Sequence, residues 1–263
     1  MERSDIAYVI NTTPKYFYIL ELHLTLLKRY APNMKWDIYL ATEEVDNPII
    51  QIIKNKYNIK IVNLEEEHSS FISSRKRTLE LLPTNIKYVL MMQEDFLLER
   101  YVNEKEITQS LKFMDENDLL LSVRYMPCPG PSNKNLKYIG KWTHLTREHD
   151  TYQFCYQATM WRRKECLEWY TILENKVASM NFKSILEKNN YEIRYNIAEN
   201  SEGQKLFFMS FPSKIHIGYD REHSFPNAVY MCPWPYRPTA IVQGELQPFA
   251  LELAKREMGI TLH

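Results

Sequence analysis

The chain has 263 residues, with 33 basic and 33 acidic side chains, 44% hydrophobic residues and six glycines. A net charge of zero provides no broad basic field that would collect nucleic acid or an anionic membrane surface. The glycines stand too far apart to form a GxGxxG dinucleotide fingerprint or a GxxxxGK[ST] phosphate loop. If the protein binds a nucleotide, other groups must contact its phosphates.

The cysteines and histidines form none of the common metal-binding motifs, because the chain contains no CxxC pair and no HExxH. Four cysteines without a paired spacing favour reduced thiols. Glu2 and Asp5 interrupt the region where a secretory signal needs an apolar run, and no uncharged apolar run approaches the roughly 18 residues of a membrane span. We therefore expect a cytoplasmic protein without a transmembrane segment.

Strand and helix patterns alternate through the first hundred residues. Short apolar, β-branched runs predict strands at residues 6–10, 36–41, 59–64 and 88–92, and helical spacing of apolar residues predicts helices at 15–30, 47–57 and from Ser69 or Ser70 to about 82. Helices of this length between strands imply right-handed crossovers and a parallel sheet. The sequence therefore predicts an α/β fold.

The pattern becomes less regular after residue 100. We expect helices at 104–117, 161–175, 181–190 and 245–258, strands at 118–125 and 152–160, a strand or bend at 191–197 and β-like structure at 206–219. The proline-rich segment 126–131 is too short to be a domain linker. One domain, residues 1–263, describes this organisation better than two.

Polar residues follow three of the predicted strands. These segments are Asn11-Thr12-Thr13, Thr42-Glu43-Glu44 and Gln93-Glu94-Asp95. Ligands of parallel sheets bind outside the carboxyl ends of the strands. We therefore expect the three segments to contribute to one binding site.

The segment Gln93-Glu94-Asp95 carries the clearest chemical signal. Two adjacent carboxylates at the end of a buried strand cost free energy unless a cation or a donor compensates them, and a divalent ion shared with diphosphate oxygens would do so. An acidic turn exposed to water is the alternative interpretation. Arg75 opens the preceding helix near the same rim, where its planar fork of donors can meet a phosphate or a base edge. A solvated helix face is the alternative for Arg75.

Three segments together resemble nucleotide-sugar-dependent glycosyltransferases of the GT-A type. SSRKRTLELLPTNIKYVLMMQED resembles their helix with an initial arginine and the strand that ends in an Asp-x-Asp metal motif. YQATMWRRKECL resembles the strand-to-helix passage of the acceptor half, and IAENSEGQKL resembles the acidic segment that supplies a catalytic base. The resemblance implies a GT-A-like (Rossmann-like) αβα sandwich with a mostly parallel central sheet, in which residues 1–100 bind the nucleotide sugar and residues 101–263 bind the acceptor.

The same resemblance implies an activity and roles for individual residues. The enzyme would move a sugar from a nucleoside-diphosphate-sugar donor to a glycan or other hydroxyl acceptor, assisted by Mn²⁺ or Mg²⁺. The implied donor contacts are Asn11, Thr12, Thr13, Glu43 and Arg75. Asp95 matches the second acid of Asp-x-Asp and would hold the metal, Gln93 stands where the first acid is expected, and Glu94 could substitute for it.

Other residues are candidates for the chemistry and for acceptor binding. Glu199, with Glu202 as the second choice, would take the proton of the acceptor hydroxyl. His216, Arg237 and Lys214 are candidates to stabilise the leaving diphosphate, His216 as a further metal ligand. Trp161, Trp234 and Tyr236 could stack on sugar rings, with a place in the core as the alternative for Trp161.

Two other classes of protein remain as alternatives. A non-catalytic carbohydrate-binding or scaffold protein on the same fold fits the neutral Gln93, which removes one charge from the metal motif. A nucleotidyltransferase also uses strand-end carboxylates and a metal, but we would expect it to have a glycine-rich phosphate loop.

Overall fold

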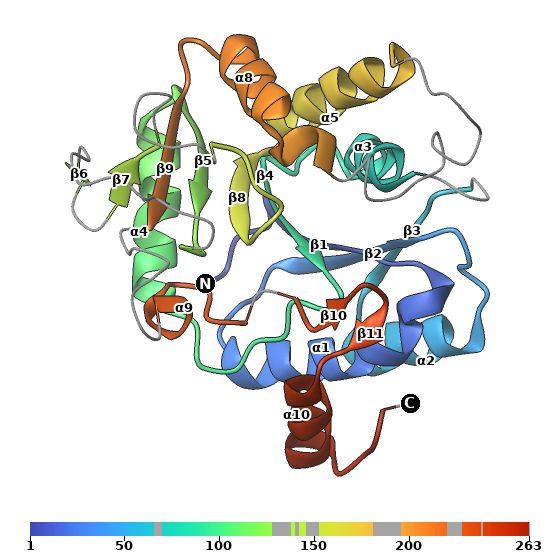
Figure 1. Ribbon diagram of the computed structural model, residues 1–263. Coiled ribbons are helices and arrows are strands. Elements are labelled where there is room, and N and C mark those ends of the chain that lie inside the picture. The colour runs from blue at the N-terminus through green and yellow to red at the C-terminus, as the bar shows by residue number, and fades with distance from the viewer. Residues whose placement is uncertain are drawn as a thin grey trace.

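The computed structural model describes residues 1–65, 70–127, 138–139, 142–145, 153–180, 196–219, 228–237 and 239–262. Its described strands build one nine-stranded sheet, in the order β3-β2-β1-β4-β8-β5-β9-β7-β6 (Figure 1). The strands are β1 (Ile6–Asn11), β2 (Asp37–Thr42), β3 (Lys60–Asn63), β4 (Tyr88–Gln93), β5 (Leu120–Arg124), β6 (Tyr138–Ile139), β7 (Trp142–His144), β8 (Thr159–Arg162) and β9 (Ile215–Tyr219). All of them except β7 and β8 run in the same direction.

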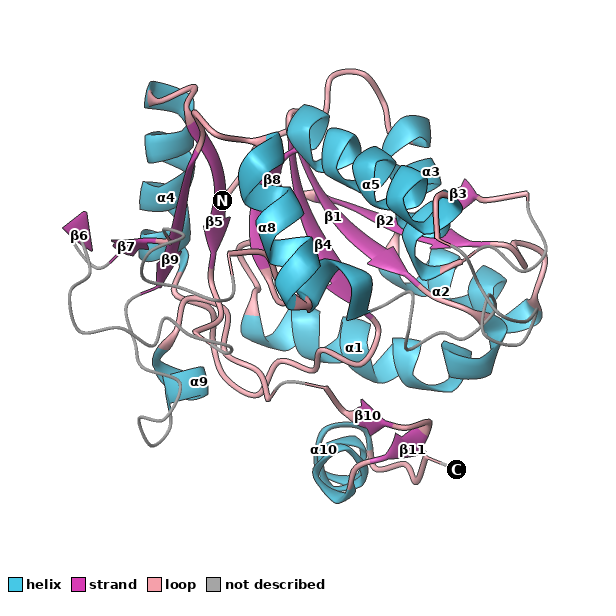
Figure 2. Cartoon of the chain, turned by 45° about the horizontal axis from the view of Figure 1, so that its top comes forward, coloured by secondary structure: helices cyan, strands magenta, loops and turns pink. Residues whose placement is uncertain are grey.

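Helices cover both faces of this sheet (Figure 2). They are η1 (Pro14–Tyr16), α1 (Phe17–Tyr30), α2 (Pro48–Tyr57), α3 (Phe71–Leu81), α4 (Glu104–Glu116), α5 (Arg163–Ala178), α8 (Ser201–Ser210), α9 (Ala228–Met231) and α10 (Pro248–Met258). The predicted α/β sandwich with a mostly parallel sheet is therefore confirmed.

The two sides of β1 bury different parts of the core, because successive side chains of a strand point to opposite faces. Tyr8 and its neighbours two residues away pack in the cluster that includes α1, α2, α4 and α10. Ala7 and Val9 pack in the cluster that includes α3, α5 and α8. Burial on both faces explains why β1 and β4 are apolar along nearly their whole length.

Helix α3 begins where the sequence predicted. The side chain of Ser70 accepts a hydrogen bond from the backbone N–H of Ser73, and the hydroxyl of Ser73 accepts one from the backbone N–H of Ser70, which together form a capping box. This start places Arg75 in the second turn of the helix.

The expected β-like structure at 206–219 is partly wrong, because helix α8 occupies its beginning and β9 its end. Phe207 in α8 and Phe211, the residue that follows this helix, both meet Trp169 edge-on. Asn200 caps this helix by accepting a hydrogen bond from the N–H of Gly203 at 2.8 Å. Packing against aromatic residues distant in the sequence thus decides the structure of this segment.

The predicted strand at 152–160 is also shorter than expected. Only its end belongs to β8, and the preceding aromatic residues fill the core: Phe154 packs against Trp161, Trp169 and Phe207. The expected helix at 181–190 lies outside the described residues, and so does most of the expected strand or bend at 191–197. The described end of that segment, 196–197, is helical and not a strand.

The C-terminal segment returns to the carboxyl end of the first strands. A two-stranded hairpin, β10 (Ile241–Val242) and β11 (Glu245–Leu246), lies beside this edge, and α10 then packs against α1 (Figure 1). None of the described helices combines the length and apolarity that crossing a membrane requires.

The backbone around Gly203 has no space for a side chain. An ideal Cβ at this position would lie 2.1 Å from the carbonyl oxygen of Ile197 and 2.6 Å from that of Ala198. We expect Gly203→Ala to lower the free energy of unfolding by about 2 kcal/mol or more, measured by urea denaturation. Ser201→Ala, at an exposed position of the same helix, is the control and should change it by less than about 0.5 kcal/mol. Equal stability of both variants would contradict this packing of α8.

Candidate functional site

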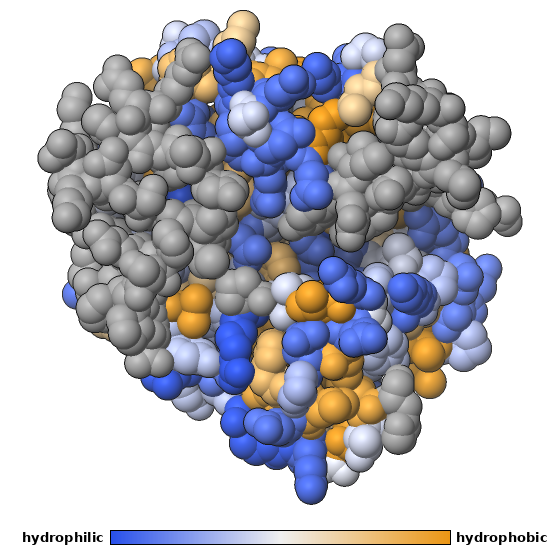
Figure 3. All heavy atoms as spheres, in the orientation of Figure 1, coloured by the Kyte–Doolittle hydropathy of each residue, from blue (hydrophilic) through white to orange (hydrophobic). Residues whose placement is uncertain are grey.

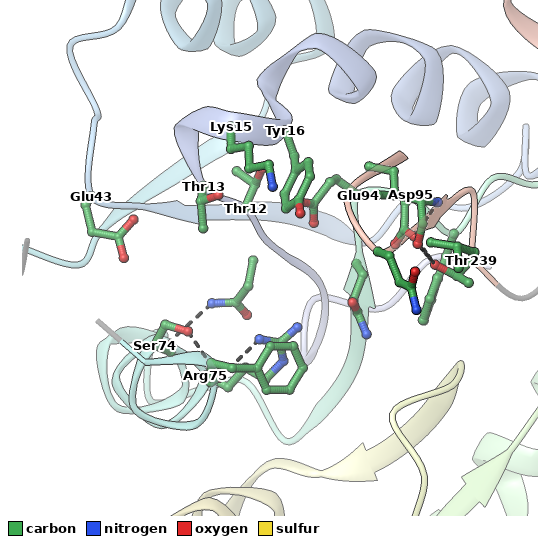
Figure 4. A pocket seen from close by; sticks show the side chains of 18 of the residues that line it. Thr12, Thr13, Lys15, Tyr16, Glu43, Ser74, Arg75, Glu94, Asp95 and Thr239 are labelled. Atoms are coloured by element: carbon green, nitrogen blue, oxygen red, sulfur yellow. Dashed lines mark hydrogen bonds between the residues drawn. The ribbon is translucent and has the colours of Figure 1, made fainter. Parts of the chain in front are cut away.

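A cavity of about 830 Å³ opens at the carboxyl edge of the sheet. The segments after β1, β2 and β4 line it together with the first turns of α3 and the C-terminal hairpin (Figure 4). This is the position at which parallel sheets bind ligands, and the volume is typical of a site for a small molecule or cofactor.

Eight of the residues singled out in the sequence line this cavity. They are Asn11, Thr12, Thr13, Glu43, Arg75, Gln93, Glu94 and Asp95. They come from three strand ends and one helix, so the sheet brings together segments that are more than eighty residues apart along the chain. Their individual roles remain predictions.

The carboxylate of Asp95 holds the C-terminal segment against the end of β4. Its Oδ2 atom accepts hydrogen bonds from the hydroxyl of Thr239 and from the backbone N–H of Ile241, the latter at 3.2 Å. The backbone carbonyl of Asp95 also accepts a bond from the N–H of Ala240 at 3.1 Å. The residue predicted to hold a metal therefore also anchors one wall of the cavity.

The carboxyl group of Glu94 lies buried beside that of Asp95. Burial, followed by the nearby charge of Asp95, raises the pKa of Glu94 to about 8, although the positive charge of Arg75 acts in the opposite direction. Burial also raises the pKa of Asp95, while its bond from Thr239 lowers it. At neutral pH the Glu94 carboxyl group thus holds its proton when no metal ion is bound in the cavity.

A buried histidine supports the turn that carries these acids. The Nδ1 atom of His23 lies 3.1 Å from the backbone oxygen of Glu94, and its Nε2 atom lies 2.7 Å from the hydroxyl of Tyr8. A carbonyl oxygen can only accept, so we assign the ring proton to Nδ1 and the donor role in the second bond to Tyr8. Burial lowers the pKa of His23 to about 4, which keeps the ring neutral and this pattern intact.

The guanidinium group of Arg75 is held at the rim by Phe71. Its Nη1 donates to the carbonyl oxygen of Phe71 at 3.1 Å, and its central carbon lies 3.3 Å from the centre of the Phe71 ring. The residue is 6% exposed. In the described part of the chain no carboxylate lies within ion-pair distance of it, so most of its donors are available to a ligand.

The cavity also contains residues that the sequence analysis missed. These are mainly Lys15, Tyr16, Gln157, Thr239 and the hairpin residues 241–244. Lys15 lies two residues after the polar segment at the end of β1, so its position along the chain was a usable signal. Thr239 and the hairpin had no such signal, because they reach the cavity only through the fold.

The structure corrects the assignment of Trp161 and His216 to the site. Trp161 is 4% exposed and packs against Phe154 and Phe207 in the core. His216 bonds to Ser122 through Nδ1 at 3.1 Å, and burial lowers the pKa of its ring to about 3. Neither residue lines the cavity. Trp234 and Tyr236 are fully buried as well.

The four charged candidates of the second half also point elsewhere. Glu199 accepts a hydrogen bond from the backbone N–H of Tyr156 at 2.9 Å, and burial raises its pKa. The others form ion pairs outside the cavity: Glu202 with Lys176 at 3.6 Å, Arg237 with Glu99 at 2.8 Å and Lys214 with Glu165 at 3.0 Å. We therefore correct their assignment to direct chemistry in this cavity.

The predicted metal set is not assembled as expected. Among the described residues, no group of three or more His, Cys, Asp or Glu side chains could hold a metal ion. Glu94 and Asp95 remain as two oxygen donors at the cavity. This donor set fits Mg²⁺ or Mn²⁺, since such ions often bind one or two carboxylates and complete their shell with phosphate oxygens and water.

Comparisons with known proteins show similarities of fold. No protein-family model and no curated protein matches the chain. Among solved structures, 4-diphosphocytidyl-2C-methyl-D-erythritol synthase from Anaerococcus prevotii has a TM-score of 0.45 and 14% identity over 88% of this chain and 97% of that one. Residues 1–349 of S. aureus TarS have a TM-score of 0.46 and 15% identity over 86% of this chain and 62% of that one.

The TarS fragment has also been solved with a ligand. Its complex with UDP-GlcNAc has a TM-score of 0.41 and 16% identity, and covers 73% of this chain and 53% of that one. This chain therefore matches less than two thirds of the length of the TarS fragment.

The raised pKa of Glu94 predicts a pH-dependent stability. A carboxyl group with a raised folded pKa contributes stability that is fully present below its ordinary pKa and is lost as the pH rises through about 8. The side chain in Glu94→Gln stays neutral over this range. We therefore expect the unfolding free energy of the variant, compared with that of wild type, to increase by up to about 1.4 kcal/mol per pH unit between pH 5 and 8. Urea denaturation across this range measures it. Glu252→Gln, on the exposed face of α10, is the control, and parallel curves for wild type and Glu94→Gln would contradict the prediction.

Proposed function

We propose that this protein binds a nucleoside-diphosphate sugar in the cavity at the carboxyl edge of the sheet and transfers the sugar to a hydroxyl acceptor. One observation carries the proposal: the same cavity contains a nearly buried arginine, two adjacent buried carboxyl groups and a row of hydroxyl and amide side chains. An arginine suits phosphate, and hydroxyl and amide groups suit a base or a sugar.

Unpaired polar atoms at the end of β1 support a bound ligand. The Oδ1 atom of Asn11 and the Oγ1 atom of Thr12 are buried and have no hydrogen-bond partner among the described residues. The amide nitrogen of Asn11, in contrast, is held by the hydroxyl of Thr78 at 2.7 Å. Buried polar atoms without partners cost free energy, which a ligand or an ordered water would recover.

In the proposed reaction the oxygen of the acceptor hydroxyl attacks the anomeric carbon of the donor sugar. The bond from that carbon to the diphosphate breaks, the diphosphate leaves, and a carboxylate takes the hydroxyl proton. Three carboxyl groups line the described cavity, those of Glu43, Glu94 and Asp95. We assign the proton to Glu94 in its ionised form, because Asp95 is engaged by the C-terminal segment and a bound divalent ion, together with Arg75, favours the carboxylate of Glu94.

Asp95 would hold the divalent ion that this class of reaction uses, and the ion would favour the ionised form of Glu94 beside it. Such an ion neutralises charge on the leaving diphosphate. Glu199 supports the site from behind by binding the backbone of Tyr156, next to the cavity residue Gln157.

A second candidate function is binding of a nucleotide sugar without transfer. Three features favour it: the neutral Gln93 in the strand-end motif, the engagement of Asp95 by Thr239, and the two-carboxylate donor set in the described part of the chain. Both functions predict donor binding, and they differ in turnover.

Arg75 provides the test of donor binding. We expect Arg75→Met to weaken the affinity for a nucleotide sugar roughly tenfold or more, because a charge-assisted hydrogen bond contributes about 1.5–3 kcal/mol. Calorimetric titration with UDP-, GDP-, ADP- and CDP-sugars, with and without Mn²⁺, measures the effect. The control is Arg77→Met. Arg77 lies on the same helix as Arg75 and forms an ion pair with Glu65. Absence of binding by wild type to all of these sugars would overturn both candidate functions.

Glu94 provides the test of transfer. We expect Glu94→Gln to slow release of the nucleoside diphosphate roughly a hundredfold or more while donor affinity changes less than about threefold. Coupled detection of the released nucleoside diphosphate, with glycan acceptors, measures it. Unchanged turnover would remove Glu94 from the mechanism. Donor binding by wild type without any turnover would select the second candidate function.

A further inference from the structure

Lys15 is a cation at the cavity that has no acidic partner among the described residues. It lies in η1, a few residues after the end of β1, and its side chain lines the cavity (Figure 4). Its ammonium nitrogen lies 5.2 Å from the centre of the Tyr16 ring. No carboxylate in the described part of the chain lies within ion-pair distance of it, in contrast to Lys214 and Arg237, which are both paired.

The C-terminal hairpin lies next to this ammonium group. Gly244 lies at the turn between β10 and β11, where it has a φ of +83° and follows Gln243 with a φ of +52°. Two left-handed residues in succession are typical of a tight hairpin turn. An ideal Cβ on Gly244 would lie 3.2 Å from the nitrogen of Lys15, so the ammonium group packs against the bare backbone of the glycine.

The position of the hairpin depends in turn on Asp95. The carboxylate of Asp95 binds the hydroxyl of Thr239 and the N–H of Ile241, the first residue of β10. The acid at the end of β4 therefore sets the hairpin, and the glycine of the hairpin leaves the space that Lys15 occupies. This series of contacts links the turn of β4 to the connection after β1.

Arg75 faces the same space from α3. Figure 4 shows Lys15 and Tyr16 on one side of the cavity and Arg75 and Ser74 on the other, with Glu94 and Asp95 toward one end. Two cations without acidic partners among the described residues thus converge on one cavity from elements sixty residues apart. A ligand that carries at least two negative charges would satisfy both of them.

We propose that Lys15 and Arg75 form a two-cation subsite for a diphosphate group, and that Lys15 contacts the phosphate that leaves with the nucleotide. The subsite itself follows from the cations, and its assignment to a nucleotide rests on the proposed function. Lysine binds phosphate as a point charge, while the arginine fork fixes its orientation, so the two residues act differently on one ligand.

Charge and length at position 15 can be separated experimentally. Lys15→Met removes the charge and keeps most of the length, and Lys15→Arg keeps the charge. Lys105→Met, at an exposed position of α4, removes the same charge at a residue that does not line the cavity. We would titrate each variant and wild type with inorganic pyrophosphate, with UDP, GDP, ADP and CDP, and with the four corresponding nucleosides.

We expect Lys15→Met to weaken pyrophosphate and the bound nucleoside diphosphate roughly tenfold or more, and to leave the nucleoside within about twofold. Lys15→Arg should restore most of the affinity, and Lys105→Met should behave as wild type. Equal weakening of nucleoside and diphosphate, or diphosphate binding unchanged in Lys15→Met, would overturn the inference and leave the proposed function intact. Pyrophosphate binding that depends on Lys15, without binding of any nucleotide, would support the subsite and overturn the proposed function.

Discussion

The cavity depends on one buried carboxylate, that of Asp95. It holds the segment Thr239–Ile241 against the end of β4, although the bonded residues are 144 and 146 positions apart. Without this carboxylate the segment before the hairpin β10–β11 would keep the backbone bond from Ala240 to the turn but lose the bonds from Thr239 and Ile241, which hold the wall of the cavity that Thr239, Ile241 and Gly244 provide. A carboxylate that accepts a hydroxyl and a backbone N–H can remain buried, because the two bonds repay part of its lost hydration.

The acidic turn is supported from the core as well as from the C-terminal segment. A neutral His23 donates to the backbone of Glu94, and Tyr8 fixes the ring proton on the required nitrogen. The two supports leave the Glu94 side chain to face the cavity, where burial and the neighbouring Asp95 raise its pKa. A divalent cation bound beside Glu94 would favour its ionised form.

The structure places some of the residues that the resemblance assigned to the site in the cavity and places others elsewhere. The donor contacts after β1 and β2 and in α3 gather at one cavity, as do both acids after β4. The residues chosen from the second half do not, since Trp161 and His216 are in the core, Arg237 and Lys214 are in ion pairs, and Glu199 holds the backbone of Tyr156. In their place the C-terminal hairpin and Lys15 complete the site.

The sequence by itself determined the α/β class, most strands and helices of the first hundred residues, and the polar segments at the strand ends. Those features depend on local periodicity and on a rule that all parallel strands share, so they can be read without knowing distant contacts. Only the tertiary structure decided that residues 206–210 are helical, since Phe207 packs there against Trp169 and Phe154, which are distant in the sequence. The tertiary structure also decided that Asp95 binds Thr239 and that Gly244 leaves space for Lys15. Each of these contacts joins segments that are far apart along the chain, and no local sequence pattern indicates that such segments meet.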